Sequence, residues 1–218
     1  TGLHMTTLKP WLYHFKYLAY RFVTSRAIDQ AQQIIVPAQT VKQTVCSYFP
    51  QAKDKISVIH EGYNPDFKQT SVTKNFKQQL VYVGSLYPHK NLQLVFKALT
   101  KLPQLKLKIV GSRKIFKQRL VELSQKLKVE NQIIWAGYLN DQKLSQELNR
   151  SLALIQPSIS EGFGLTGVEA MAAKTALLAS DIPTFKEIYQ QAPIYFNPKS
   201  VKSLISAIGQ IQNQEIRL

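Results

Sequence analysis

Apolar and polar residues follow two different patterns along the chain. In the first part, apolar positions recur at helical spacing from Trp11 to Gln32, and a second helix is predicted over Gln39–Tyr48. Short apolar runs at Ile34–Val36 and Ile56–Ile59 are typical of strands. Segment 60–78 is polar and shows little periodicity, so we interpret it as a linker.

From Leu80 onward, short apolar runs alternate regularly with helical segments. The predicted strands are Leu80–Val83, Leu105–Val110, Gln132–Trp135, Leu152–Ile155, Ala176–Ala179 and Ile194–Phe196. The predicted helices are Leu92–Lys101, Phe116–Leu127, Gln142–Asn149, Leu165–Ala173, Thr184–Tyr189 and Val201–Gln212. Single helices between strands imply βαβ crossovers, so we predict an α/β fold, a doubly wound parallel sheet. We place the domain boundary near residue 70, which divides the chain into domains 1–70 and 71–218.

The composition narrows the class of protein. With 218 residues, of which 44% are hydrophobic, the chain can bury a sizeable core. The single cysteine, Cys46, excludes an internal disulfide framework and a cysteine-rich zinc module. No apolar run approaches the roughly 18 residues of a spanning helix, and no signal-peptide pattern opens the chain. We therefore expect a soluble protein located in the cytoplasm.

The net charge of +15 indicates a surface that attracts polyanions. Ten Lys and Arg residues but one acid, Glu122, lie between Lys97 and Lys128. Solvated helix faces account for such a run without any partner. If the charge does serve a partner, that partner is a phosphorylated small molecule, the anionic inner face of a membrane or a nucleic acid. Contact with the membrane would be peripheral, and nucleic acid is the partner that we favour least.

The loop after the strand at Leu80–Val83 contains a candidate anion site. Ligands of doubly wound sheets bind at the carboxyl ends of the strands, where this loop begins. Gly84 allows close approach to the backbone. Lys90 and Asn91 are predicted to open the next helix, whose N-terminal N–H groups favour an anion. We interpret Lys90 as a phosphate contact; the alternative is a surface lysine beside an ordinary Asn cap.

The loop after Leu152–Ile155 carries two glutamates eight positions apart. Glu161 precedes a predicted helix and Glu169 lies within it, so both can face one cleft at different depths. Carboxylates accept hydrogen bonds from the vicinal hydroxyls of a sugar or ribose, and the N–H groups around Gly162 and Gly164 suit a phosphate. The alternative is a solvated loop Glu and a helix-surface Glu.

The same loop also matches a dinucleotide-binding fingerprint. Gly162, Gly164 and Gly167 fit G-x-G-x-x-G, and Asp181 follows the next apolar run. Against this interpretation, residues 157–161 separate the strand from the first glycine, and an acid directly before the glycines would repel a pyrophosphate. An NAD-dependent oxidoreductase therefore remains an alternative, as does a basic nucleic-acid-binding α/β module.

Metal-ligand patterns do not occur in the sequence. The five aspartates form no D-x-D pair, and the four histidines never show metal-ligand spacing. We therefore predict no metal site.

Taken together, these motifs resemble the retaining glycosyltransferases of family 4, which have the GT-B fold. The E-x7-E signature of that family matches the segment from Glu161 to Glu169. The resemblance covers about residues 80–212, and residues 11–67 look like the tail of a preceding acceptor-binding domain. The further matching segments are Val83-Gly84, Lys90-Asn91, Ile109–Gly111, Ala136–Tyr138 and Ala179–Pro183 with Glu187.

The resemblance implies a nucleotide-sugar donor site with the catalytic residues Lys90 and Glu161. Lys90 would contact the diphosphate, Glu161 and the loop amides would hold the transferred sugar, and Glu169 would accept from the ribose. Backbone at Gly137 and Tyr138 would flank the base. The full set of donor-binding candidates is Gly84, Lys90, Gly137, Tyr138, Glu161, Gly162, Phe163, Gly164, Leu165 and Glu169.

The implied activity is transfer of a hexose, such as mannose or glucose, with retention at the anomeric carbon. The donor would be UDP- or GDP-linked, the acceptor a glycan or lipid-linked molecule, and no metal or cofactor would be needed. By this resemblance the chain is the donor-binding part of a longer enzyme, and we expect it to be inactive alone.

Three positions depart from the pattern of the family. Many relatives carry an arginine where this chain has Ser85, so phosphate binding would rest more heavily on Lys90. The Gly and Pro that usually follow the signature helix are replaced by Lys174 and Ala176. The sequence therefore does not predict the conformation of the turn between that helix and the next strand.

Overall fold

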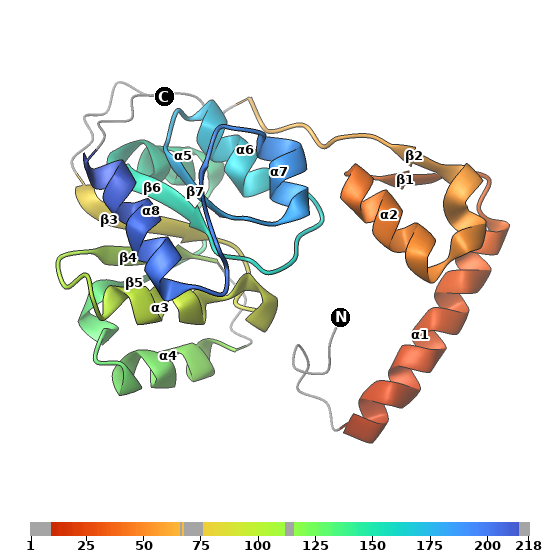
Figure 1. Cartoon of the computed structure of the whole chain (residues 1–218), viewed down its shortest axis with the longest axis horizontal. Coiled ribbons are helices and arrows are strands. Elements are labelled where there is room, and N and C mark those ends of the chain that lie inside the picture. The colour runs from red at the N-terminus through yellow and green to blue at the C-terminus, as the bar shows by residue number, and fades with distance from the viewer. Residues whose placement is uncertain (1–9, 66, 68–75, 112–115, 214–218) are drawn as a thin grey trace. The chain divides into compact units, whose positions relative to one another are not determined.

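A computed structural model describes residues 10–65, 67, 76–111 and 116–213 of the chain (Figure 1). The chain divides into two compact units, Thr1–Glu61 and Gly62–Leu218, and each is described here by itself. Residues 66 and 68–75 of the predicted linker lie outside the described residues, as do Arg113 and Lys114 of the basic run. The functional roles predicted for the two parts of the chain stay predictions.

The first unit is built on a short parallel sheet. Its elements are α1 (Pro10–Gln30), β1 (Ile34–Val36), α2 (Gln39–Tyr48), the 3-10 helix η2 (Pro50–Lys55) and β2 (Ile56–Val58). β1 and β2 pair in parallel, with Ile34 opposite Ile56. Ile28, Val36, Ala52 and Ile56 form a small buried core. The predicted helices and strands of this part of the chain are confirmed.

The second unit contains a six-stranded sheet in which every pair of neighbours is parallel. The strands are β3 (Phe76–Val83), β4 (Lys106–Val110), β5 (Ile133–Gly137), β6 (Ser151–Gln156), β7 (Leu177–Ser180) and β8 (Ile194–Phe196). Their order across the sheet is β5-β4-β3-β6-β7-β8. The order reverses between β3 and β6, and such a switch point opens a crevice at the carboxyl ends of the two strands.

Helices cover both faces of this sheet (Figure 1). They are α3 (Leu92–Leu99), α4 (Lys117–Lys126), α5 (Asp141–Arg150), α6 (Leu165–Ala172), α7 (Pro183–Tyr189) and α8 (Val201–Asn213), with the 3-10 turns η3 (Pro88–Lys90) and η4 (Glu130–Gln132). Side chains of α3, α4 and α8 pack on one face and those of α5, α6 and α7 on the other. The prediction of a doubly wound α/β fold is confirmed.

One predicted boundary is wrong, because β3 begins at Phe76, within the segment interpreted as linker. The start of this strand reads Phe-Lys-Gln-Gln, in which one apolar residue is followed by three polar ones, so no apolar run marks it. Gln79 is nevertheless buried, and its side-chain amide donates to the hydroxyl of Ser151 at 3.3 Å. A polar residue is accepted in the sheet here because a neighbouring strand supplies its partner.

No helix within the described ranges is both long enough and apolar enough to cross a membrane.

Candidate functional site

A cavity of about 150 Å³ lies at the switch point between β3 and β6. It is lined by Tyr82, Val83, Gly84, Lys90, Gln156, Ser158, Glu161, Gly164, Leu165 and Thr166. These residues come from the carboxyl ends of the two central strands, the loops that follow them and the first turn of α6. Five of the ten donor-site candidates, Gly84, Lys90, Glu161, Gly164 and Leu165, are among them.

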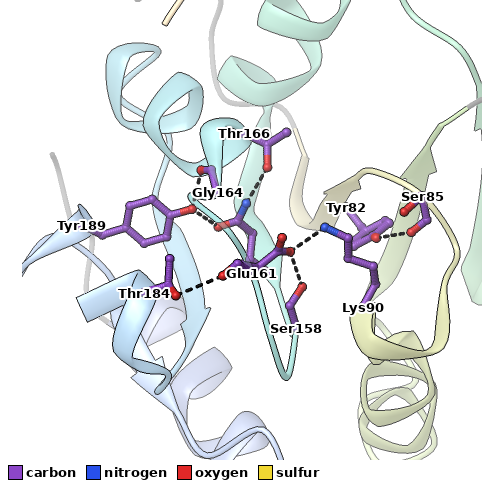
Figure 2. Close-up of polar contacts among 10 residues, drawn as sticks. Tyr82, Ser85, Lys90, Ser158, Glu161, Gly164, Thr166, Thr184 and Tyr189 are labelled. Atoms are coloured by element: carbon purple, nitrogen blue, oxygen red, sulfur yellow. Dashed lines mark hydrogen bonds and ion pairs between the residues drawn. The ribbon is translucent and has the colours of Figure 1, made fainter. Parts of the chain in front are cut away.

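An ion pair joins the two loops that border the cavity. Lys90 Nζ lies 2.6 Å from Glu161 Oε1, and the same oxygen accepts a hydrogen bond from the hydroxyl of Ser158 at 2.7 Å (Figure 2). The two charged side chains are 20% and 13% exposed, so water screens this pair less than a surface pair. The pair places one cation and one carboxylate at the edge of the sheet where the topology predicts a ligand.

The loop carrying Lys90 differs from the prediction in one respect. Lys90 and Asn91 do not open a helix: Lys90 ends the turn η3, Asn91 has a φ of 57°, and α3 begins at Leu92. The side chain of Asn91 does not cap α3 but donates to the carbonyls of Pro157 and Pro198 at 3.0 and 2.9 Å. The ordinary Asn cap weighed as an alternative is therefore wrong, because this amide connects the loops after β3 and β6.

The glycine-rich segment of the second loop is held by a network that the sequence did not reveal. The Tyr189 hydroxyl lies 2.5 Å from both Gln156 Oε1 and the carbonyl oxygen of Gly164. The amide of Gln156 donates to the hydroxyl of Thr166, and the hydroxyl of Thr184 donates to the carbonyl of Glu161 at 3.0 Å. Figure 2 shows how these contacts fix the loop between the end of β6 and the start of α6.

Packing explains two of the three glycines that match the dinucleotide fingerprint. A Cβ at Gly164 would lie 2.0 Å from the hydroxyl of Tyr189, and one at Gly167 would lie 2.5 Å from the same atom. Gly164 also has a φ of 97°, which side chains rarely adopt. Gly162 is exposed, with open space around it, and β6 ends at Gln156, well before it. In this chain Gly164 and Gly167 thus fit against the ring of Tyr189, and Gly162 does not lie at a strand end.

Glu169 sits on α6, one helical turn beyond the cavity. It lies four residues after Leu165, on the same side of the helix and about 6 Å along its axis. Burial raises the pKa of Glu169 to about 7, and the nearby carboxylate of Asp141 adds to this. Glu169 is not among the described residues that line the cavity, so only the other glutamate of the signature meets Lys90 directly.

Gly84, which lines the cavity, lies in a closely packed part of the backbone. The hydroxyl of Tyr82 donates to the carbonyl of Ser85 at 2.5 Å, and a Cβ at Gly84 would lie 3.0 Å from that hydroxyl. Burial raises the pKa of the Tyr82 phenol, and Glu161 raises it further. A Cβ at Gly111 would lie 2.3 Å from the carbonyl oxygen of Gly84. The loops after β3 and β4 can therefore approach each other this closely only because position 111 has no side chain.

The remaining candidates lie outside the cavity. Gly137 ends β5 with a φ of 69°, and the neighbouring Tyr138 is 74% exposed. Phe163 is buried.

His89, next to Lys90 in the chain, is a titratable group near the ion pair. Its pKa is lowered by burial and, to a lesser extent, by the charge of Lys90. The backbone carbonyl of His89 accepts a hydrogen bond from the N–H of Ile159 at 2.8 Å. Within the part of the chain that the structure describes, no three His, Cys, Asp or Glu side chains gather as a metal site would require.

Comparison with protein-family models decides the family. The model described as "Glycosyl transferases group 1" matches residues 64–217, more than half of the chain. The chain belongs to the glycosyl transferases group 1. The matched segment contains the whole six-stranded sheet and every residue that lines the cavity.

Curated relatives of the chain include O-antigen glycosyltransferases. The chain is 29% identical over 210 residues to the O-antigen chain mannosyltransferase RfbU of Salmonella typhimurium, covering 94% of this chain and 59% of that protein. It is 25% identical to the serotype-specific mannosyltransferase WbdA of Escherichia coli, covering 81% of this chain and 24% of that protein. The chain thus spans less than two thirds of the length of each of these relatives.

Solved structures of glycosyltransferases share the fold. Sucrose-phosphate synthase from Thermosynechococcus elongatus has a TM-score of 0.78 and 20% identity, over 88% of this chain and 52% of that one. Anabaena HepE, solved in complex with UDP and glucose, has a TM-score of 0.77 and 20% identity, over 91% of this chain and 58% of that one. The α/β fold with parallel sheets matches these GT-B glycosyltransferases.

Proposed function

We propose that this chain is the donor-binding part of a retaining hexosyltransferase of family 4. The observation that carries the proposal is the pairing of Lys90 with Glu161 inside a cavity at the switch point of the sheet. Similarity to RfbU and WbdA, both named mannosyltransferases, favours mannose as the transferred hexose. The acceptor we propose is a growing glycan or a lipid-linked intermediate.

In this proposal the nucleotide sugar breaks the ion pair between Lys90 and Glu161, and each side chain then contacts a different part of the donor. Lys90 donates to the diphosphate of a UDP- or GDP-linked sugar, a charge-assisted hydrogen bond that is stronger than one between neutral groups. Glu161 then accepts hydrogen bonds from hydroxyls of the hexose, with the amides of Gly162, Phe163 and Gly164 beside it. The carboxylate of Glu169 accepts hydrogen bonds from the ribose hydroxyls, and the backbone at Gly137 and Tyr138 flanks the base.

The proposed reaction exchanges one bond at the anomeric carbon for another on the same face. The bond from C1 to the phosphate oxygen breaks, and a bond from the acceptor hydroxyl oxygen to C1 forms. The nucleoside diphosphate leaves and the hydroxyl proton passes to its released oxygen. Lys90 stabilises the negative charge that develops on that oxygen, a role for which a fixed cation is suited. We propose that neither a metal ion nor a cofactor takes part.

A ligand panel tests this proposal on the 218-residue chain. Calorimetric titration with UDP, GDP, ADP and NAD should show binding of one nucleoside diphosphate and none of NAD. Lys90→Ala should weaken that binding by about 2 kcal/mol, or some thirtyfold, since it removes a charged hydrogen-bond donor. Lys186→Ala is the matched control, because Lys186 also pairs with an acid, Asp181, in the same unit but outside the cavity.

Two results would overturn the proposal in different directions. Binding of NAD with discrimination through Asp181 would favour the oxidoreductase. Salt-sensitive binding of DNA that is indifferent to Glu161→Ala, without binding of any nucleoside diphosphate, would favour the nucleic-acid-binding module.

A further inference from the structure

The carboxylate of Glu161 is held through one of its two oxygens. Lys90 Nζ and the hydroxyl of Ser158 contact Oε1 at 2.6 and 2.7 Å (Figure 2). Among the residues that the structure describes, no donor contacts Oε2. A carboxylate oxygen accepts two hydrogen bonds through its lone pairs, so Oε1 is fully used and Oε2 keeps its capacity. One oxygen of Glu161 is thus bound to the protein, and the other is available to a ligand in the cavity.

The backbone fixes the position of the Ser158 hydroxyl. Ser158 is 1% exposed and lines the cavity. On one side of it, the carbonyl of Pro157 accepts a hydrogen bond from the side-chain amide of Asn91 at 3.0 Å. On the other side, the N–H of Ile159 donates to the carbonyl of His89 at 2.8 Å. Because both flanking residues are bound to the loop after β3, this short side chain has little freedom to move.

The other donor to Glu161 is less firmly fixed. Lys90 carries its ammonium on a flexible four-carbon stem, and in the proposed function this ammonium turns to the diphosphate. The main chain of Glu161 then stays in place, since its carbonyl accepts from the hydroxyl of Thr184 at 3.0 Å. Its side chain would regain rotamer freedom without a second donor, and binding of the sugar would have to remove that freedom again. Ser158 is the donor that can hold the carboxylate at this stage.

We propose that Ser158 is a positioning residue for the carboxylate of Glu161. When the diphosphate binds Lys90, the hydroxyl of Ser158 keeps its hydrogen bond to Oε1 and orients Oε2 toward hydroxyls of the hexose. The serine acts through Glu161 and not by contact with the donor. This inference rests on the proposed function, to which it adds a residue that lies before the E-x7-E signature.

Titration with two kinds of ligand tests this role on the 218-residue chain. The probes are GDP with GDP-mannose and UDP with UDP-glucose, and the pair whose nucleoside diphosphate binds the parent chain is used. Ser158→Ala should weaken binding of the nucleotide sugar roughly tenfold, because a hydrogen bond to a charged group is lost. Binding of the free nucleoside diphosphate should change less than about twofold, since Lys90 is untouched. A serine that merely supports the fold would weaken both ligands alike.

A double-mutant cycle shows whether the effect passes through Glu161. In a Glu161→Ala background, the additional change Ser158→Ala should alter the affinity for the nucleotide sugar less than about twofold, because the acceptor is already absent. A loss of similar size in both backgrounds would mean that Ser158 contacts the donor itself, and would overturn the positioning role.

Ser124→Ala is the matched control. Ser124 is also 1% exposed, its hydroxyl donates to the carbonyl of Val121 at 2.7 Å, and it does not line the cavity. Its replacement should leave both affinities unchanged. Ser158→Cys is a second variant of nearly the same size with a weak donor, and it should lose affinity for the nucleotide sugar as Ser158→Ala does. The thermal midpoint of each variant checks its fold, and either Ser158 variant tests the role alone.

The inference and the proposed function fail in different ways. A parent chain that binds neither UDP nor GDP overturns the proposed function, and the inference with it. A parent chain that binds one nucleoside diphosphate and its sugar, with Lys90→Ala weakening both, supports the proposed function. If Ser158→Ala then binds both ligands as the parent chain does, or loses both equally, only the positioning role of Ser158 is overturned.

Discussion

At the scale of single residues, the free chain already contains a cation and an anion that a nucleotide sugar could separate. Lys90 and Glu161 neutralise each other at 2.6 Å, and the hydroxyl of Ser158 donates to the same carboxylate oxygen. In the proposed function this pairing keeps both side chains in place without a ligand. The pair also competes with the donor, and this leads to an unusual expectation for Glu161.

Replacing Glu161 with Gln should act in opposite directions on two ligands. Binding of the free nucleoside diphosphate should tighten by roughly 1 kcal/mol, about fivefold, because Lys90 no longer pairs with a carboxylate. Binding of the nucleotide sugar should not gain, since the amide is a poorer acceptor for sugar hydroxyls than a carboxylate. Calorimetry with both ligands measures the difference. Parallel changes for the two ligands would show that Glu161 does not face the sugar.

Removing the hydroxyl of Tyr189 should loosen the glycine-rich loop. Tyr189→Phe removes the one proton that the hydroxyl shares between Gln156 Oε1 and the carbonyl of Gly164, which keeps the N–H of Gly167, so the change should cost about 1 kcal/mol of stability. Chemical denaturation measures this loss, and titration should show weaker binding of the nucleotide sugar.

The control for this variant is Tyr195→Phe. The hydroxyl of Tyr195 lies 2.8 Å from the carbonyl oxygen of Gln190 and 3.1 Å from that of Phe185, and Tyr195 does not line the cavity. Its loss should reduce stability but leave nucleotide affinity unchanged. If both tyrosine variants bound the sugar nucleotide as the parent chain does, the hydroxyl of Tyr189 would have no positioning role.

The raised pKa of Glu169 should make stability depend on pH. Its pKa in the folded chain, about 7, lies above the ordinary value of 4.5, so the folded state binds the proton more tightly than the unfolded state. This contribution to stability is complete below pH 4.5 and is lost as the pH rises through 7. Between pH 5 and pH 8 the thermal midpoint of the parent chain should therefore fall more than that of Glu169→Gln. If the thermal midpoints of the parent chain and of Glu169→Gln changed equally with pH, the carboxyl of Glu169 would be solvated and its pKa would not be raised.

At the scale of elements, the turn after α6 shows how this chain replaces the glycine usual in the resembled family. The N–H of Lys174 donates to the carbonyl of Met171, and that of Thr175 donates to the carbonyl of Ala170. This is the Schellman pattern, whose key residue takes a left-handed conformation, and Lys174 has a φ of 52°. The turn geometry left open by the sequence is thus an ordinary helix end, with backbone strain at Lys174 because a residue with a Cβ takes the left-handed conformation.

Relieving this strain should stabilise the protein. Lys174→Gly should raise the free energy of unfolding by about 0.5–1 kcal/mol, because glycine adopts a positive φ without a Cβ clash but loses more chain entropy on folding. Lys174→Ala retains the Cβ and should bring no such gain. Urea denaturation compares the three chains; equal stabilisation by Ala and Gly would mean that removing the lysine side chain, and not backbone strain, is responsible.

The sequence predicts the elements well where burial alone decides them. Strands such as Leu152–Ile155 are continuous apolar runs because both faces of a parallel sheet are covered, and the observed β6 extends this run by one residue at each end. The prediction fails where a hydrogen-bond partner distant in the sequence determines the local structure. Gln79 is an example, because its burial depends on the hydroxyl of Ser151. It fails again at Asn91, whose conformation follows from carbonyls of two distant loops.

At the scale of the whole molecule, topology brings the two principal site residues together. Lys90 follows β3 and Glu161 follows β6, and a doubly wound sheet places the ends of these strands side by side. Their proximity could be predicted from the order of strands and helices. The contribution of Tyr189 could not, because it depends on how α7 packs against α6 across the face of the sheet.

The central claim is that this cavity receives the diphosphate of a nucleotide sugar. A crystal structure of the chain with UDP or GDP, whichever binds, tests it most directly. We predict that Lys90 Nζ leaves Glu161 and lies within hydrogen-bond distance of a phosphate oxygen, with the ribose toward Glu169. A nucleotide bound elsewhere, beside an intact ion pair between Lys90 and Glu161, would contradict the account.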